Sequence, residues 1–375
     1  MTCAGEVEIE TVYGQDPDTG QWVCPMRELW GLRARQEMSP VLEKRLCYTA
    51  TVTGSYEAAA AEARNWGVEA DDSTIHRHVG QAGERADRLR DNRVERALST
   101  DTRAEVVKEA KRDLPPGKIS LVIMMDGTML RERGQQWGLK GAEIGGERVV
   151  WHELKTAIIF RLDQRAETAS GRGMVVEKYY EAWQGDPYEF GRRVYAEALR
   201  RGLMQAERVY VVADGAVWIW NVVADRFSDA TGVLDFYHAS EHLWQIAREL
   251  YGQDEEKARA WVEPLLHQLA HGGEAGVLDT LDDLLALCAQ LDEQAKQIIK
   301  GEVQYFQAHR DHLHYQAVQA QGCPKGSGAV ESACGQLQHR FKRTGQFWSP
   351  PGQRALLALD LARRNHDWDE IWELN

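Results

Sequence analysis

The chain has 375 residues, of which 43% are hydrophobic and 27% are charged, so a sizeable buried core is available and wholesale disorder is excluded. The longest purely apolar runs, such as residues 121–125 and 209–213, are too short to cross a bilayer, and no secretory signal opens the chain. We therefore expect a cytoplasmic protein without a membrane partner, built from roughly two to three domains.

The charge is unevenly distributed along the chain. A net charge of -13 disfavours nucleic-acid binding when it is taken alone. However, residues 251–300 hold ten acidic against four basic residues, whereas residues 321–366 hold seven basic against two acidic ones. The acidic average can therefore conceal a basic face that meets phosphates.

Six cysteines are scattered without any CxxC pair, which disfavours both a structural zinc site and a disulfide framework. We expect reduced, mostly buried thiols. The cysteines are Cys3, Cys24, Cys47, Cys288, Cys323 and Cys334.

The chain after an N-terminal segment (1–38) predicts three helices within residues 39–95. Ser39 and Ser55 are N-cap residues for the first two, and Asp72 or Ser73 can cap the third. The outline is that of a helix-turn-helix, and a plain three-helix bundle fits these residues equally well. A charged helical linker (96–117) follows and ends at Pro115-Pro116-Gly117.

The next part of the chain predicts an α/β domain with a central mixed sheet. The predicted strands are residues 119–125, 149–162, 174–183, 209–213 and 233–237. Asp186-Pro187 starts a helix between the third and fourth strands, and a short helix lies near residues 218–224.

An acidic, strand-free helical insertion is predicted for residues 238–320. Beyond it, Ser327 can cap a helix with an apolar stripe at Val330, Ala333, Cys334, Leu337 and Phe341. A last helix is predicted for residues 352–364.

Two of the apolar strands end in Asp-Gly, at Asp126 and Asp214. Adjacent parallel strands would bring both carboxylates to one sheet edge. A third acid, Glu331, borders the apolar stripe of the helix after Ser327. Oxygen-only sites suit Mg²⁺ or Mn²⁺, and two such ions support phosphoryl transfer. Either Asp-Gly alone is better explained as a turn, but the pair in this strand order favours a metal site.

At this point the sequence resembles bacterial insertion-sequence DDE transposases of the mutator-like RNase H superfamily, and is closest to the Kra type. The motifs are Asp126-Gly127-Thr128, Asp214-Gly215-Ala216, Leu234-Asp235-Phe236-Tyr237-His238 and Gly326-Ser327-Gly328-Ala329-Val330-Glu331, in that order. The resemblance covers about residues 39–365. It implies an RNase H-like catalytic core split into residues 118–237 and 321–375, with Asp126, Asp214 and Glu331 as the metal-binding triad.

Further residues gain roles from this resemblance. His238 of the Asp235-x-x-His238 pattern is a candidate catalytic or DNA-positioning residue, with a polar helix cap as an equal alternative. Candidate DNA contacts are Ser73, Thr74, His76 and Arg77 on the third helix and Lys325, Arg340, Lys342 and Arg343 near the third acid. Trp137, Trp218, Trp220 and Trp348 are minor candidates for stacking on unpaired bases.

The sequence thus predicts a Mg²⁺- or Mn²⁺-dependent transposase that binds double-stranded DNA at terminal inverted repeats and at the target. We expect it to associate with the nucleoid and to form a homodimer or larger oligomer on DNA. Three alternatives stay open: a nuclease on the same core that never joins strands, an inactive or domesticated copy that regulates by binding DNA, and an unrelated α/β enzyme in which the Asp-Gly turns are structural. Relatives often carry paired cysteines of a zinc segment before the helix-turn-helix, whereas only Cys24 lies in that region here.

Overall fold

The computed structural model describes residues 2–3, 12–29, 38–139, 148–169, 173–287 and 291–373. Cys288 lies outside these residues; Cys24, Cys47, Cys323 and Cys334 are buried free thiols, as expected, and Cys3 is partly exposed. The chain divides into two compact units. The first unit comprises residues 1–92, 132–148 and 347–375, and the second comprises residues 93–131 and 149–346. The segment predicted as residues 321–375 is thus divided between the two units.

The first unit is mainly helical. Its elements are β1 (Gly14–Gln15), β2 (Trp22–Val23), α1 (Pro25–Leu29), α2 (Pro40–Val52), α3 (Tyr56–Asn65), most of α4 (Asp72–Leu98), α14 (Pro350–Arg364) and α15 (Glu370–Glu373). Three helices therefore lie where the sequence predicted them, and α14 packs on α2 within the unit.

The helix starts follow the predicted capping chemistry with one correction. The Ser39 and Ser55 hydroxyls accept hydrogen bonds from backbone N–H groups in the first turns of α2 and α3. The third helix is not capped by Asp72 or Ser73. Instead, the Asp71 carboxylate accepts the Thr74 N–H at 2.6 Å, because the helix begins one residue earlier than its apolar pattern suggested.

A buried ion pair links α2 to α4. The Glu43 carboxylate lies 3.1 Å from the Arg85 guanidinium and 3.3 Å from the His78 ring, and all three side chains are buried. Burial acts to raise the pKa of Glu43, but the His78 hydrogen bond and the Arg85 charge outweigh it and the pKa is lowered. Because an ion pair is directional, whereas an apolar contact is not, the Glu43–Arg85 pair fixes the position of α2 along α4.

Two glycines of α4 are expected to respond in opposite ways to replacement by Ala. A Cβ on Gly83 would lie 2.5 Å from Ala355 Cα in α14, whereas nothing lies within 4 Å of one on Gly80. We expect Gly80→Ala to raise the free energy of unfolding by about 0.5–1 kcal/mol, since Ala restricts the unfolded chain and favours helix. Gly83→Ala should lower it by about 1–3 kcal/mol through overpacking. Urea denaturation of the two variants measures both, and stabilisation by Gly83→Ala would contradict the close approach of the helices.

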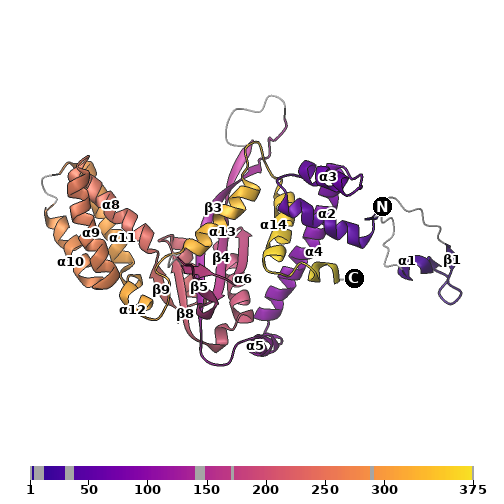
Figure 1. Cartoon of the computed structure of the whole chain (residues 1–375), viewed down its shortest axis with the longest axis horizontal. Helices are drawn as coiled ribbons and strands as arrows, with labels where there is room; N and C mark the ends of the chain where they lie inside the picture. Colours follow the sequence, from indigo (N-terminus) through magenta and orange to yellow (C-terminus); the bar gives the residue numbers. More distant parts are fainter. Residues whose placement is uncertain are drawn as a thin grey trace. The chain divides into compact units, whose positions relative to one another are not determined.

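The second unit is built on a five-stranded mixed sheet (Figure 1). Its strands are β3 (Ile119–Arg133, which extends into the first unit at its end), β4 (Val149–Arg161), β7 (Tyr179–Gln184), β8 (Ala206–Ala213) and β9 (Thr231–Leu234). Their spatial order is β7-β4-β3-β8-β9. β4 and β7 pair antiparallel, whereas β3, β8 and β9 run parallel to one another. The sequence prediction of a central mixed sheet is therefore confirmed.

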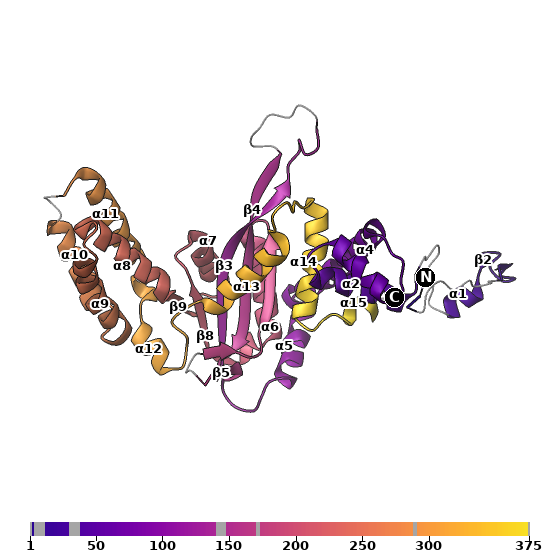
Figure 2. The same cartoon turned by 45° about the horizontal axis from the view of Figure 1, so that its top comes forward.

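Helices cover both faces of this sheet. On one face, α6 (Pro187–Arg200) and α7 (Val217–Arg226) share a buried core with alternate residues of β3 and β8, among them Ile123 and Val211. On the other face lies α13 (Gly328–Phe341), which contacts β4 and crosses the strands in Figures 1 and 2. The predicted apolar stripe of this helix, from Val330 to Phe341, is buried throughout. A further helix, α5 (Arg103–Arg112), packs on α6.

The predicted insertion is helical along its described length (Figure 2). It consists of α8 (Phe236–Tyr251), α9 (Glu255–His271), α10 (Ala275–Leu287), α11 (Glu293–Ala308) and α12 (Tyr315–Ala320). α8 packs against both α9 and α11. Of the helices that the structure describes, none combines the length and apolar character needed to span a membrane.

Two predicted strand limits need correction. β3 does not end at Met125 but continues to Arg133, because its later residues pair with β4 rather than with β8. The segment predicted as one strand over residues 174–183 is two strands, β6 (Gly173–Val175) and β7, and β6 pairs with β5 (Arg165–Glu167) in a separate small sheet.

Candidate active site

Three aspartates follow directly on three aligned positions of the parallel strands. Met125 of β3 is in register with Ala213 of β8, which is in register with Leu234 of β9. The next residue in each strand is Asp126, Asp214 or Asp235. Because parallel strands lie about 4.8 Å apart, the three carboxylates form a row along one edge of the paired segment. The sequence prediction that Asp126 and Asp214 meet at one edge is consistent with this register.

The charges of the acids act on one another. Burial raises the pKa of Asp126 above its ordinary value, and the charges of Asp214 and Glu331 raise it further. Hydrogen bonds from the Gly127 N–H and the Cys334 thiol act in the opposite direction. Glu331 of helix α13 is thus close enough to Asp126 of strand β3 for their charges to interact.

Asp235, the third aspartate of the row, is an anchor for α8 and α13. It is fully buried, and one carboxylate oxygen accepts the Tyr237 and His238 N–H groups at 2.6 and 3.0 Å, which caps α8. Its other oxygen accepts the N–H and the hydroxyl of Ser327, the latter at 2.6 Å. Asp235 therefore fixes the start of α13 at the end of β9.

Ser327 connects this anchor to the third acid. Its hydroxyl lies 2.9 Å from the Glu331 carboxylate as well as 2.6 Å from that of Asp235. Ser327 is the N-cap residue of α13, as predicted, but its side chain makes no cap hydrogen bond and its hydroxyl lies between these two carboxylates instead. The chain from Asp235 through Ser327 to Glu331 sets the position of the third acid relative to the sheet edge.

Further along, α13 is attached to the sheet by polar contacts that flank Asp126. The Cys334 thiol lies close enough to the Asp126 carboxylate to influence the pKa of that acid, and it lies beside Thr156 of β4. One turn later the Gln338 side chain donates to the Thr128 hydroxyl of β3. Since Asp126 and Thr128 are two residues apart on a strand, both face α13.

The helical insertion supports the loop that carries Asp214. Gly215 lies against the Tyr305 ring of α11, where a Cβ would come within 2.6 Å of the ring, so only glycine fits. The Trp220 indole donates to the Asp214 carbonyl at 2.9 Å, and the ring of His312 stacks on Trp220 at 3.7 Å. Burial lowers the pKa of His312 to about 4, so this ring packs as a neutral group. The sequence did not identify this role of the insertion.

The donor set suits a hard divalent cation. Asp126 and Asp214 are half-buried, Glu331 is exposed, and none of the three forms an ion pair with a described lysine or arginine. Oxygen-only sites of this kind match Mg²⁺ or Mn²⁺. Among the described residues, no three His, Cys, Asp or Glu side chains lie near enough together to hold an ion.

A stability measurement tests the raised pKa of Asp126. Because burial and the nearby Asp214 and Glu331 charges raise this pKa in the folded state, ionising Asp126 lowers stability as pH rises from its ordinary pKa through the raised one. At neutral pH the metal-free Asp126→Asn variant should therefore have a higher free energy of unfolding than wild type. This difference in the free energy of unfolding should vanish below the ordinary aspartate pKa, where Asp126 is protonated in both the folded and the unfolded wild type. Urea denaturation with EDTA over a pH series measures this, with the exposed Asp225→Asn as control; equal stability at every pH would contradict it.

The predicted DNA contacts fall into two groups. Ser73, His76 and Arg77 are exposed at the start of α4, and Thr74 beside them is half-buried. The ring of His76 also packs edge-on against that of Tyr56 at 5.0 Å.

Near the third acid, Arg343 is exposed and Lys342 is half-exposed at the end of α13. Lys325 lies over the Phe236 ring at 3.9 Å. Arg340 is only 7% exposed, because it is on the buried side of α13, and it is therefore not available as a DNA contact.

His238 is in the first turn of α8, where its ring lies 3.6 Å from the Glu241 carboxylate. The cap of this helix is Asp235, not His238, so the capping alternative for His238 does not hold, and its catalytic role stays a prediction. Of the tryptophans considered for stacking, Trp348 is buried, while Trp218 and Trp220 pack on Phe190 and His312. Trp137 is 39% exposed.

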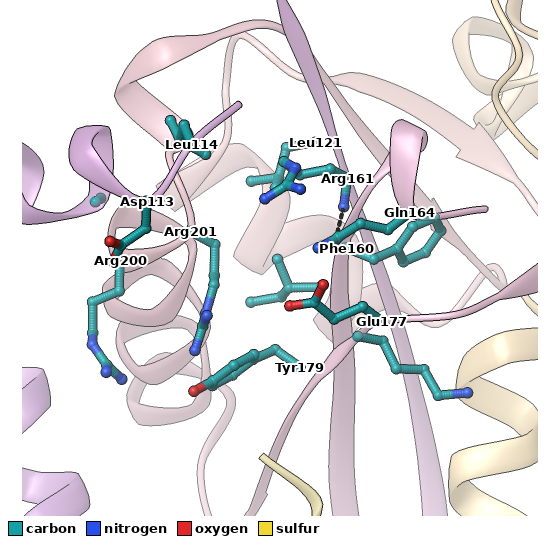
Figure 3. A pocket seen from close by; sticks show the side chains of 13 residues that line it. Asp113, Leu114, Leu121, Phe160, Arg161, Gln164, Glu177, Tyr179, Arg200 and Arg201 are labelled. Atoms are coloured by element: carbon teal, nitrogen blue, oxygen red, sulfur yellow. Dashed lines mark hydrogen bonds between the residues drawn. The ribbon is translucent and has the colours of Figure 1, made fainter. Parts of the chain in front are cut away.

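A cavity of about 130 Å³ in the second unit lies away from the acids (Figure 3). It is lined by the start of β3 at Leu121, the end of β4 at Arg161 and the end of α6 at Arg201. Its arginines are already paired: Arg161 with Asp163, and both Arg200 and Arg201 with Glu197. This end of the sheet is opposite to the one where Asp126 and Asp214 follow their strands.

Comparison with known proteins gives a family but no function. No curated protein matches this sequence. A solved structure, the Drosophila P element transposase strand transfer complex, is similar at 10% identity with a TM-score of 0.37, over 92% of this chain and 96% of that one. The profile of the uncharacterised protein family UPF0236 matches residues 167–371, more than half of the chain. The chain therefore belongs to UPF0236.

Proposed function

We propose that this protein is a DDE-type transposase that cuts and joins DNA strands with Mg²⁺ or Mn²⁺, using Asp126, Asp214 and Glu331. One observation carries the proposal. Asp126 and Asp214 directly follow the aligned pair Met125 and Ala213 of two parallel strands, and the charge of Glu331 reaches Asp126. Mutual repulsion in a half-buried setting is the arrangement expected of carboxylates that share a cation.

The three carboxylates are the proposed metal ligands. Divalent ions held by them would activate a water or a 3′-hydroxyl and stabilise the leaving oxygen in phosphoryl transfer. The other residues prepare the ligands: Asp235 and Ser327 orient Glu331, and Tyr305 and Trp220 hold the loop of Asp214. These contacts hold the segments that carry the ligands, so that movement of the three side chains would suffice to bring them together around an ion.

Basic and polar residues are proposed to bind the DNA. Ser73, Thr74, His76 and Arg77 of α4 are the proposed groove contacts for terminal repeats. Lys325, Lys342 and Arg343, which lie in the same unit as the acids, are the proposed phosphate contacts, which makes binding salt-dependent. His238 is retained as a DNA-positioning residue. Because two DNA ends must be joined, we propose at least a dimer on DNA; a monomeric mass for the complex in light scattering would refute this.

The test is strand cleavage and joining by the full-length protein. A supercoiled plasmid that carries the DNA flanking the gene is incubated with Mg²⁺, Mn²⁺, Ca²⁺ or EDTA. The proposal predicts cuts with Mg²⁺ or Mn²⁺ only, together with products in which the flanking ends are joined to new DNA. Cuts without joining would favour a nuclease on the same core. Binding without cuts under any condition would favour a DNA-binding regulator.

A further inference from the structure

The largest exposed tryptophan surface of the second unit lies at the far end of α13. Trp151, near the start of β4, has 48% of its surface exposed, although it lies beside the central strand β3. Tryptophan is enriched at binding surfaces, because its ring offers a large apolar face together with a polar N–H group.

Cations surround this ring. The Lys342 ammonium lies 5.0 Å and the Arg131 guanidinium 5.8 Å from its centroid. Arg131 also donates to the Arg343 carbonyl at 2.7 Å, which ties β3 to the end of α13. The platform, as we name Arg131, Trp151, Lys342 and Arg343, therefore combines an aromatic ring of β4 with three positive charges, one from β3 and two from the end of α13.

Two cations of the platform, Lys342 and Arg343, are not neutralised by a described carboxylate. The nearby carboxylate of Glu153 is instead 2.8 Å from the Lys155 ammonium. A half-exposed aromatic ring beside the cations of Lys342 and Arg343 matches the chemistry of a nucleotide, whose base stacks while its phosphate meets the charge.

Two independent paths give the same separation between the platform and the acids. Lys342 follows Glu331 by eleven residues on one helix, about 16 Å at about 1.5 Å per residue. Arg131 follows Asp126 by five residues on one strand, about 16 Å at about 3.3 Å per residue. At about 3.4 Å per nucleotide, this is a distance of about five nucleotides.

We propose that the platform binds an unpaired nucleotide of a DNA strand about five nucleotides from the position where the acids act, with the base stacked on Trp151 and its phosphates near Lys342 and Arg343. This inference rests on the proposed function, since it takes the acids as the cleavage site. It adds a single-strand subsite, which requires the DNA end to be frayed or tailed where it passes the platform.

The test compares two DNA probes with the full-length protein in EDTA, so that no strand is cut. One probe is a blunt duplex, and the other has the same duplex with a single-stranded tail of about five nucleotides. Fluorescence anisotropy measures the Kd of each for wild type, Trp151→Ala, Trp151→Phe and Trp22→Ala. Trp22 is 68% exposed in the N-terminal hairpin and serves as the matched control.

Wild type should bind the tailed probe more tightly than the blunt one. Trp151→Ala should weaken binding of the tailed probe about tenfold and leave the blunt probe unchanged, whereas Trp151→Phe keeps most of the affinity. Trp22→Ala should change neither. Equal losses for both probes, or none, would overturn the subsite while leaving DNA binding itself in place. If wild type binds neither probe, the proposed function falls as well. Circular dichroism of each variant verifies that it is folded.

Discussion

Replacing Asp214 with Asn is expected to lower the rate of metal-dependent DNA cleavage by at least about a thousandfold, equivalent to about 4 kcal/mol of transition-state stabilisation. The amide keeps the shape of the side chain and can still accept the Ala216 N–H bond, which is 2.9 Å long in the wild type. It removes the negative charge through which Asp214 would share an ion with Asp126. DNA affinity should stay within about twofold of wild type, because the proposed phosphate contacts lie elsewhere.

The matched control is Asp225→Asn, at the end of α7, where the carboxylate is 52% exposed and pairs with Arg226. This variant should cut DNA at the wild-type rate. Cleavage rates come from the labelled plasmid in Mg²⁺ and Mn²⁺, and affinities from anisotropy in EDTA. If Asp214→Asn cuts as fast as wild type, Asp214 is only the first residue of a turn.

The second large effect is expected at Asp235. Replacing it with Ala would remove the acceptor of two partly buried N–H groups of α8 and of the buried Ser327 N–H, and would leave the Ser327 hydroxyl with Glu331 alone. We expect the free energy of unfolding to fall by about 3–5 kcal/mol, since unsatisfied buried donors and a lost charged acceptor are both costly. Guanidinium denaturation followed by circular dichroism measures this loss.

Asp254→Ala provides the comparison. Asp254 also caps a helix of the insertion, accepting the Lys257 N–H at 3.1 Å, but it is near the surface and bonds to one segment only. Its removal should cost about 1 kcal/mol, the usual value of an N-cap. Similar losses for the two variants would show that Asp235 is an ordinary cap and does not join α13 to the sheet.

Much of the fold follows from local patterns in the sequence. The two apolar runs before Asp126 and Asp214 predicted buried parallel strands, because strands covered on both faces are apolar throughout. The cap residues Ser39, Ser55 and Asp186 predicted helix starts that the structure has. The stripe on α13 predicted which face of that helix is buried. Each of these inferences needs only residues that are close together in the chain.

The long-range contacts could not be predicted in this way. Asp235 and Ser327 are 92 residues apart, and a pattern that fits a helix cap does not reveal a second bonding partner on a distant helix. The same holds for Tyr305 beside Gly215. Trp151 carries no local signal that separates it from the buried tryptophans, since exposure depends on what packs nearby. Arg340 was misassigned for the complementary reason: a basic residue in a basic segment can still lie on the buried side of its helix.

The central claim is that Asp126, Asp214 and Glu331 hold divalent ions, and anomalous diffraction from crystals soaked in Mn²⁺ tests it most directly. The account predicts an anomalous peak between the Asp126 and Asp214 carboxylates at about 2.0–2.2 Å from their oxygens, which is lost in Asp214→Asn crystals. Well-ordered carboxylates at this edge with no Mn²⁺ between them, at concentrations where DNA is cut, would contradict it.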